Sequence, residues 1–493
     1  MGMERRALQI VLLCQCLAWA AGCTSSGGDA VPPGEVADVR ADPHNAPPEL
    51  SETTQLSDYL AYAALHNPGL EAAFNRWKAE LERVPQATAL PDPRFTYRYY
   101  IERVETRVGP QRQSFEIAQT FPWFGKLALR GDVAMEAANA AKERYEAQKL
   151  KLFHEVKDAY YEYYYLGRAV EVVGKTRDLA KQFEDVARMK YRTGTAQLAD
   201  VIRAQVELGK LEDRLRSLTE MQQPTVARLN AALNRSVTAA LPWPKSVPEE
   251  TVASTDDEIL RMLQERNPEL KVLDHEIARY RKAGELARKE YYPDVTLGLS
   301  YIETGSAVMP GVSDSGKDPV MVGVSVNLPI WFGKYRAGER EAARRRWAAI
   351  KEKADRTNLL SYRAKRVLFD FRDAERKISL YRDTLLPLAR ESLKTTEAGF
   401  AAGTSSFLDL IDTQRVMLEF ELSYERALTD HAQRLAELEM LVGQDLPRGE
   451  APPETETGEA DSPDEVPAAE PAKQEEPKEE ADQDRTEEEP SEP

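Results

Sequence analysis

The sequence predicts a mainly α-helical protein in which long antiparallel coiled-coil helices are combined with four strands of a membrane β-barrel. Three observations support this prediction. The stretch Lys126–Arg192 runs for 67 residues without proline, and two short regions in each half alternate apolar with polar residues. The second half of the chain also repeats short sequence motifs of the first half in the same order. Helices of this length exceed those of ordinary globular domains and are typical of coiled-coil packing.

The N-terminal residues 1–22 have the features of a lipoprotein signal peptide. Two arginines precede a mostly apolar run, and three small residues precede Cys23. This ending resembles the bacterial lipobox, whose cysteine is diacylated and becomes the mature N-terminus. An ordinary signal peptide with an incidental cysteine is the alternative. Because Cys14 and Cys16 also lie in this segment, the mature chain would keep Cys23 alone, as suits an exported protein without structural disulfides.

Two segments of unusual composition flank the folded region. Residues 23–51 are rich in Gly, Pro and Ser and are expected to form a lipidated tether. Residues 448–493 form an acidic Pro/Glu-rich tail without aromatic residues, which we expect to be disordered. The tail carries most of the net charge of −17, so the remainder offers no basic face for nucleic acid. No stretch of 18 apolar residues occurs, which excludes a protein that crosses a membrane by helices.

The region between these segments is a duplication, with repeat one at 52–240 and repeat two at 241–447. Sequence marks recur in the same order, with offsets that drift only from 200 to 209 residues. The pairs are Asn67-Pro68 and Asn267-Pro268, Pro91-Asp92 and Pro293-Asp294, Trp123-Phe124-Gly125-Lys126 and Trp331-Phe332-Gly333-Lys334, and Gly194-Thr195 and Gly403-Thr404. Chance is a poor explanation for ordered matches of this kind.

Each repeat contains one predicted strand pair. The alternation places the strands at about 93–103, 113–121, 293–303 and 319–329. About ten residues is the length that crosses a bilayer when a strand is tilted, and the apolar faces end in aromatic residues, as a lipid-facing belt would. A small soluble sheet with one buried face is the alternative.

The strand count implies an oligomer. Four strands cannot close a barrel, an open edge in lipid leaves backbone groups unpaired, and the smallest barrels have eight strands. Three chains would supply twelve strands, so a homotrimer is expected. Both strand pairs begin and end next to helices, so the helices must extend from the same end of the barrel. The result is a tube on the order of 100 Å long, at 1.5 Å per residue.

The candidate site residues lie where each long helix ends. In both repeats a Gly-Thr pair follows, at Gly194-Thr195 and at Gly403-Thr404. Glycine is expected to end the first helix, and threonine to cap the next. Asp409 and Asp412 then share one helix face, and three copies would form rings of carboxylates that favour cations. Asp200 corresponds to Asp409, whereas Arg203 occupies the place of the second carboxylate. A plain helix N-terminal charge is the alternative.

No catalytic, cofactor or metal constellation is found. The five histidines are scattered, and no methionine cluster suited to copper occurs. Five tyrosines between Tyr160 and Tyr165 are predicted to pack between helices rather than to bind a ligand. We therefore expect a protein that is not an enzyme.

These motifs resemble those of the TolC-like outer-membrane efflux protein family over essentially all of residues 52–447. The resemblance implies a trimeric twelve-stranded barrel on a twelve-helix periplasmic tunnel. It also implies an exit duct that works with a periplasmic adaptor protein and an inner-membrane resistance-nodulation-division transporter. The Trp-Phe-Gly-Lys motif is most similar to the corresponding motif of family members that serve heavy-metal pumps. Heavy-metal cations or drugs are then the expected solutes, and the outer membrane, with lipid anchor and inserted barrel, is the expected location.

The family pattern also assigns roles at the helix turns. Asp409 and Asp412 fall on both aspartates of the Gly-Thr-x-x-x-x-Asp-x-x-Asp pattern that lines the periplasmic aperture, and the turns themselves are the expected adaptor contacts. The sequence departs from the best-known member at the latch of the closed aperture, where Phe400 and Ser405 replace tyrosine and arginine. The competing functional hypothesis is an envelope-spanning lipoprotein scaffold that conducts nothing.

Overall fold

The computed structural model describes residues 55–449. The signal peptide, Cys23, the tether and almost all of the acidic tail lie outside the described residues.

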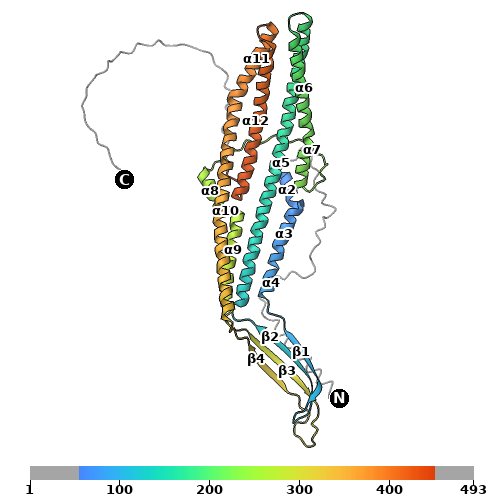
Figure 1. Ribbon diagram of the computed structural model, residues 1–493, viewed down its shortest axis with the longest axis vertical. Coiled ribbons are helices and arrows are strands. Elements are labelled where there is room, and N and C mark those ends of the chain that lie inside the picture. Colours follow the sequence, from blue (N-terminus) through green and yellow to red (C-terminus); the bar gives the residue numbers. More distant parts are fainter. Residues whose placement is uncertain (1–54, 450–493) are drawn as a thin grey trace, which may run out of the picture. The chain divides into compact units, whose positions relative to one another are not determined.

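The described residues form an antiparallel array of long helices joined to one small sheet, and the same order of elements occurs twice (Figure 1). In repeat one the elements are α2 (Leu56–His66), α3 (Pro68–Leu81), α4 (Arg83–Thr88), β1 (Arg94–Val104), β2 (Gln111–Phe121), α5 (Lys126–Arg192), α6 (Leu198–Glu220) and α7 (Gln222–Ala232). In repeat two they are α8 (Asp256–Arg266), α9 (Pro268–Lys289), β3 (Val295–Thr304), β4 (Val320–Val326), α10 (Phe332–Leu380), the π-helical turn η1 (Tyr381–Leu385), α11 (Leu386–Ala402) and α12 (Phe407–Val442).

The two longest helical segments differ in continuity. Helix α5 is unbroken over 67 residues, as its lack of proline predicts. The corresponding segment of repeat two contains Pro387 and is divided into α10, η1 and α11. Proline has no N–H and its ring collides with the carbonyl four residues earlier, so a wider π-helical turn before it relieves the collision without ending the rod.

The four strands form one antiparallel sheet in the order β1-β2-β3-β4. The two hairpins are therefore joined by pairing between β2 and β3, with Ile117 opposite Leu299 and Ala118 opposite Gly298. Strands β1 and β4 are the edges. Strand β4 ends at Val326, three residues before the expected end, because its partner in the last ladder pair, Val295, is the first residue of β3.

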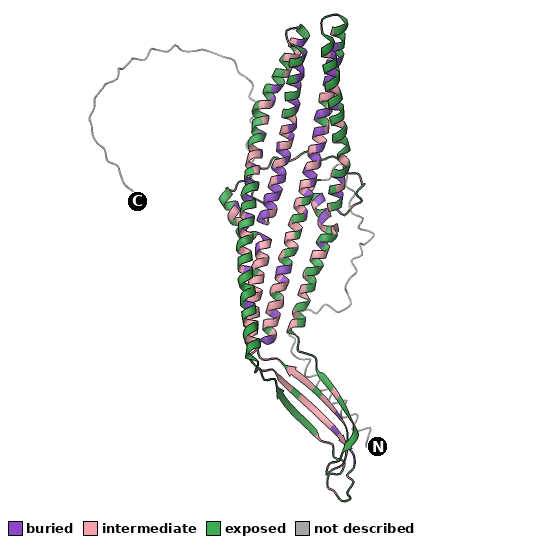
Figure 2. Cartoon of the chain, in the orientation of Figure 1, coloured by how far each residue is buried: buried purple, intermediate pink, exposed green. Residues whose placement is uncertain are grey.

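The sheet exposes the apolar face that the alternation predicts. Ile101 is 91% exposed and Val322 is 78% exposed, and every residue of β4 is exposed (Figure 2). Most of the buried residues instead lie along the helices. An apolar face of this size is unusual on the surface of a protein dissolved in water.

The tyrosine cluster packs between helices, as predicted. Tyr160, Tyr161 and Tyr163 belong to a buried group with residues of α2 and α7. The Tyr163 ring stacks on Trp243 at 4.4 Å, and its hydroxyl donates to the Leu241 carbonyl at 3.0 Å. These contacts fasten the segment after α7 to the middle of α5.

Candidate functional site: the helix turns and the strand–helix corners

The two turns at the far end of the helices have the same backbone. Gly194 has φ +73° and Gly403 has φ +83°, the left-handed conformation that ends a helix. In both turns the threonine N–H then donates to the carbonyl five residues earlier at 2.8 Å, from Thr195 to Lys190 and from Thr404 to Gly399.

The expected role of the threonines is wrong. Their hydroxyls do not cap the next helix but donate backwards, at 3.1 Å from Thr195 and 3.2 Å from Thr404. Helices α6 and α12 begin two residues later than that expectation requires, with Gln197 and Ser406 as their N-cap residues. Glycine and threonine thus both belong to the C-terminal end of the preceding helix.

Asp409 is the third residue of α12 and completes a reciprocal N-terminal cap. Its carboxylate accepts hydrogen bonds from the Ser406 hydroxyl at 2.7 Å and the Ser406 N–H at 3.0 Å, and its N–H donates to the Ser406 hydroxyl at 3.2 Å. These hydrogen bonds hold the pKa of Asp409 below its ordinary value, so the group is ionised at neutral pH. The helix-cap role is therefore present in the structure.

The other two aspartates have cationic neighbours. Asp412 lies 3.2 Å from Arg415, and Asp200 lies 3.3 Å from Arg203. The Asp412 side chain is 58% exposed, so its carboxylate can still meet a solute. Asp409, in contrast, has no cationic partner among the described residues. The two aspartates of repeat two thus lie close along one helix, and only Asp412 has a cationic neighbour, Arg415, which also binds Glu207.

Contacts between the two hairpins were not visible in the sequence. The Lys190 ammonium of α5 donates to the Phe400 carbonyl of α11 and lies 4.3 Å from the Phe400 ring centre. The Phe400 ring packs on Phe407 at 5.5 Å. Phe400 thus ties the two hairpins of one chain together.

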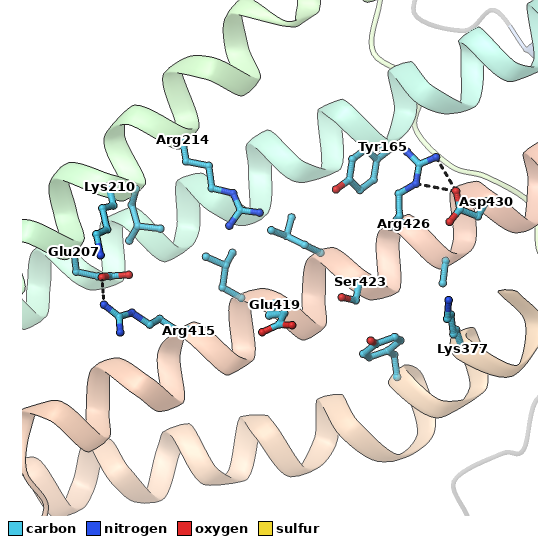
Figure 3. A pocket seen from close by; sticks show the side chains of 15 residues that line it. Tyr165, Glu207, Lys210, Arg214, Lys377, Arg415, Glu419, Ser423, Arg426 and Asp430 are labelled. Carbon is cyan, nitrogen blue, oxygen red and sulfur yellow. Dashed lines mark hydrogen bonds and ion pairs between the residues drawn. The ribbon is translucent and has the colours of Figure 1, made fainter. Parts of the chain in front are cut away.

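A second link lies deeper, where Arg415 of α12 reaches Glu207 of α6 at 2.5 Å. The hydrogen bond from Arg415 holds the pKa of Glu207 below its ordinary value, although partial burial opposes this. This pair closes one end of a cavity of about 690 Å³ between α6, α12 and η1 (Figure 3). At the other end Arg426 pairs with Asp430 at 2.7 Å. The lining combines these charged side chains with apolar ones, among them Leu211, Leu418 and Leu422.

The strand–helix corners are the other place where repeated residues meet. Lys126 is fully buried, and its ammonium donates to Asp294 at 2.8 Å and to the Tyr292 carbonyl at 3.0 Å. The Trp123 N–H donates to the same aspartate at 2.9 Å, and the Trp123 ring stacks on Tyr292 at 5.4 Å. The Trp-Phe-Gly-Lys motif of repeat one is thereby locked onto the Pro-Asp motif of repeat two.

Within residues 55–449, no group of three or more His, Cys, Asp or Glu side chains is arranged to hold a metal ion. His275 meets one carboxylate, Glu136, at 2.8 Å, and His431 stacks on Phe371. No helix in the same part of the chain is both long and apolar enough to span a membrane.

Comparison with known proteins identifies the family. The sequence profile of the family described as "Outer membrane efflux protein" matches twice, at residues 60–235 and 259–444. The cobalt-zinc-cadmium resistance protein CzcC of Cupriavidus metallidurans is 21% identical over 409 residues, covering 80% of this chain and 92% of CzcC. The chain therefore belongs to the outer membrane efflux protein family, as the sequence motifs indicated.

Solved structures share the fold. The crystal structure of CusC has a TM-score of 0.68 at 14% identity and covers 79% of this chain and 92% of its own. That of the outer membrane protein VceC from Vibrio cholerae has a TM-score of 0.65 at 17% identity, covering 79% and 96%. At such identities the similarity establishes the fold, and the family assignment rests on the profile.

Proposed function

We propose that three copies of this chain form a closed twelve-stranded barrel continued by a helical tunnel, and that the assembly passively conducts solutes across the outer membrane. The sheet carries this proposal. Its apolar face is exposed on all four strands, and both edge strands have unpaired backbone groups, which lipid does not tolerate. Three sheets joined edge to edge would pair these backbone groups, and the surrounding lipid would cover the apolar face.

The proposed assembly is the outer-membrane part of a tripartite pump, with a periplasmic adaptor protein and an inner-membrane resistance-nodulation-division transporter, and it is not an enzyme. The turns at Gly194-Thr195 and Gly403-Thr404 are the proposed adaptor contacts, because they are the ends of the hairpins farthest from the strands. Divalent metal cations are the proposed solutes, since CzcC is named for cobalt, zinc and cadmium resistance. A lipid on Cys23 would add a second attachment to the membrane.

At the tunnel entrance, Asp409 and Asp412 of three chains would form two neighbouring rings of carboxylates. The helix-cap role of Asp409 does not oppose this, because a carboxylate that accepts hydrogen bonds keeps its negative charge. Rings of this kind favour cations over anions. Asp200, paired with Arg203, would contribute less to the potential at the entrance.

Planar-bilayer recording on the purified full chain tests conduction against the scaffold hypothesis. We expect unitary current steps from the parent chain and from Cys23→Ser, because the barrel rather than the lipid forms the pore. The substitution should at the same time abolish labelling with palmitate. Protein that is inserted and trimeric but electrically silent would contradict conduction and favour the scaffold.

A further inference from the structure

The strand–helix corner of repeat two carries the same residue types as the corner of repeat one, but its lysine has no ion pair among the described residues. Lys334 corresponds to Lys126 and is exposed. Asp92 corresponds to Asp294 and is also exposed, with no ion pair among the described residues. Trp331, the counterpart of Trp123, is 72% exposed.

The sheet order explains why only one corner is complete. Lys126 follows β2 and Asp294 precedes β3, and these two strands are paired. By the same repeat, Lys334 follows β4 and Asp92 precedes β1, but these strands are the two opposite edges of the sheet. With the sheet open as it is here, the residues can meet only if β4 of one chain pairs with β1 of another.

We infer that the corner is completed between copies of this chain, with Lys334 of one copy bound to Asp92 of the next, as Lys126 is bound to Asp294 within the chain. The inference rests on the proposed trimer and goes beyond it, because it names the contact and the register that join the chains. The opposite charges of Lys334 and Asp92 support a second copy of this chain as the partner at the open corner. Shape supports it too, since exposed Trp331 would meet Leu90, the counterpart of Tyr292 and itself 48% exposed.

The repeat also predicts the register in which β4 of one chain pairs with β1 of the next. Equating Pro122 with Pro329, with Ile330 as one extra residue before Trp331, and Asp294 with Asp92 maps the observed pair Ala118–Gly298 onto Ser325 opposite Thr96. The same mapping places Val324 opposite Tyr97, as Ile117 lies opposite Leu299. Both apolar pairs then lie on the exposed face, so the register keeps one face apolar and the other polar across the junction.

Cross-linking tests this register. The sequence has only three cysteines, all within the first 23 residues, so new cysteines give a clean readout. Under oxidation, Ser325→Cys with Thr96→Cys should yield covalent oligomers of up to three chains on a denaturing, non-reducing gel. Ala118→Cys with Gly298→Cys is the matched control and should cross-link within one chain. Ser325→Cys with Arg98→Cys is displaced by one diagonal step of about 7–8 Å and should cross-link poorly.

Charge reversal tests the ion pair. Lys334→Asp alone and Asp92→Lys alone should lower the temperature at which the trimer dissociates on an unheated gel series, and the double reversal should restore it. Lys317→Asp, at an exposed lysine of the β3–β4 loop, should leave it unchanged. Failure of the double reversal to restore the trimer would overturn the ion pair.

The outcomes separate this inference from the proposed function. A trimer that conducts current without the Ser325–Thr96 cross-link would overturn the register and leave the channel intact. Cross-linked trimers that stay silent in bilayers would support the junction and contradict conduction. A Ser325–Thr96 cross-link confined to single chains would show that β4 returns to β1 of its own chain, which overturns the inference.

Discussion

The helical-hairpin turns at Gly194-Thr195 and Gly403-Thr404 have the same backbone conformation but opposite net charge. Residues 188–203, around the turn of repeat one, contain four basic residues and one acidic residue. The equivalent residues 397–412 of repeat two contain three acidic residues and no basic one. Glycine in the left-handed conformation and a back-bonding threonine are common to both turns. The requirements of the turn have thus been kept in both repeats, while the surface charge has diverged.

The difference gives the two turns different tasks in the proposed tunnel. The basic turn supplies Lys190, which holds the backbone of the other hairpin. The acidic turn supplies Asp409 and Asp412, the residues proposed to face solutes. In a trimer the two kinds of turn would alternate around the entrance, so that neighbouring hairpins attract each other.

The largest expected effect comes from neutralising the acidic turn. Asp409→Asn with Asp412→Asn should strongly reduce cation selectivity, most of all at ionic strengths below 0.1 M, where the Debye length exceeds about 10 Å. Reversal potentials across a salt gradient measure this, and Asp200→Asn, at the basic turn, is the matched control with a small expected shift. Equal reversal potentials for the double variant and the parent chain would leave the aspartates with the helix-cap role alone.

An intermediate effect is expected where the turns are alike. Gly194→Ala and Gly403→Ala should each destabilise their turn by about 1–2 kcal/mol, because alanine is strained at positive φ. A Cβ at either glycine would meet nothing within 4 Å beyond the neighbouring residues of the chain. Backbone strain is therefore the whole cause of the destabilisation, and the two substitutions should lower the stability of their turns by equal amounts. Native-state hydrogen exchange of the turn amides measures both. Clearly unequal costs would show that the turns are not equivalent when assembled.

The smallest effect concerns the pair between Glu207 and Arg415. Because the pKa of Glu207 is lowered in the folded chain, its stabilising contribution is complete above its ordinary value of about 4.3 and is lost as the pH falls through the folded value. The change should be about 0.5–1 kcal/mol, as for other partly exposed pairs. It should be seen as faster proteolysis between the hairpins at acidic pH. Glu207→Gln should remove this pH dependence, and an unchanged profile would assign it to other carboxylates.

Local features of the fold could be predicted from the sequence, whereas contacts between distant segments could not. The bounds of α5 follow from the absence of proline and from the glycines that flank it, Gly125 before its start and Gly194 after its end. The link from Lys190 to Phe400 depends on how two hairpins lie side by side, and no local pattern reports that. The Gly-Lys and Pro-Asp motifs were visible as repeated marks, but their meeting in space became clear only from the pairing of β2 with β3. The sequence also could not decide which helix a turn threonine would cap.

Because of the π-helical turn η1, the long helical rod of repeat two differs in stiffness from that of repeat one. Helix α5 is one unbroken helix, so a displacement at one end is transmitted to the other unless the whole helix bends. The corresponding rod of repeat two has a joint at Tyr381–Leu385, placed between the corner that carries Lys334 and the turn that carries Asp409. Motion of the acidic turn can be taken up at this joint, so the strand end of the rod can remain still while the entrance end moves.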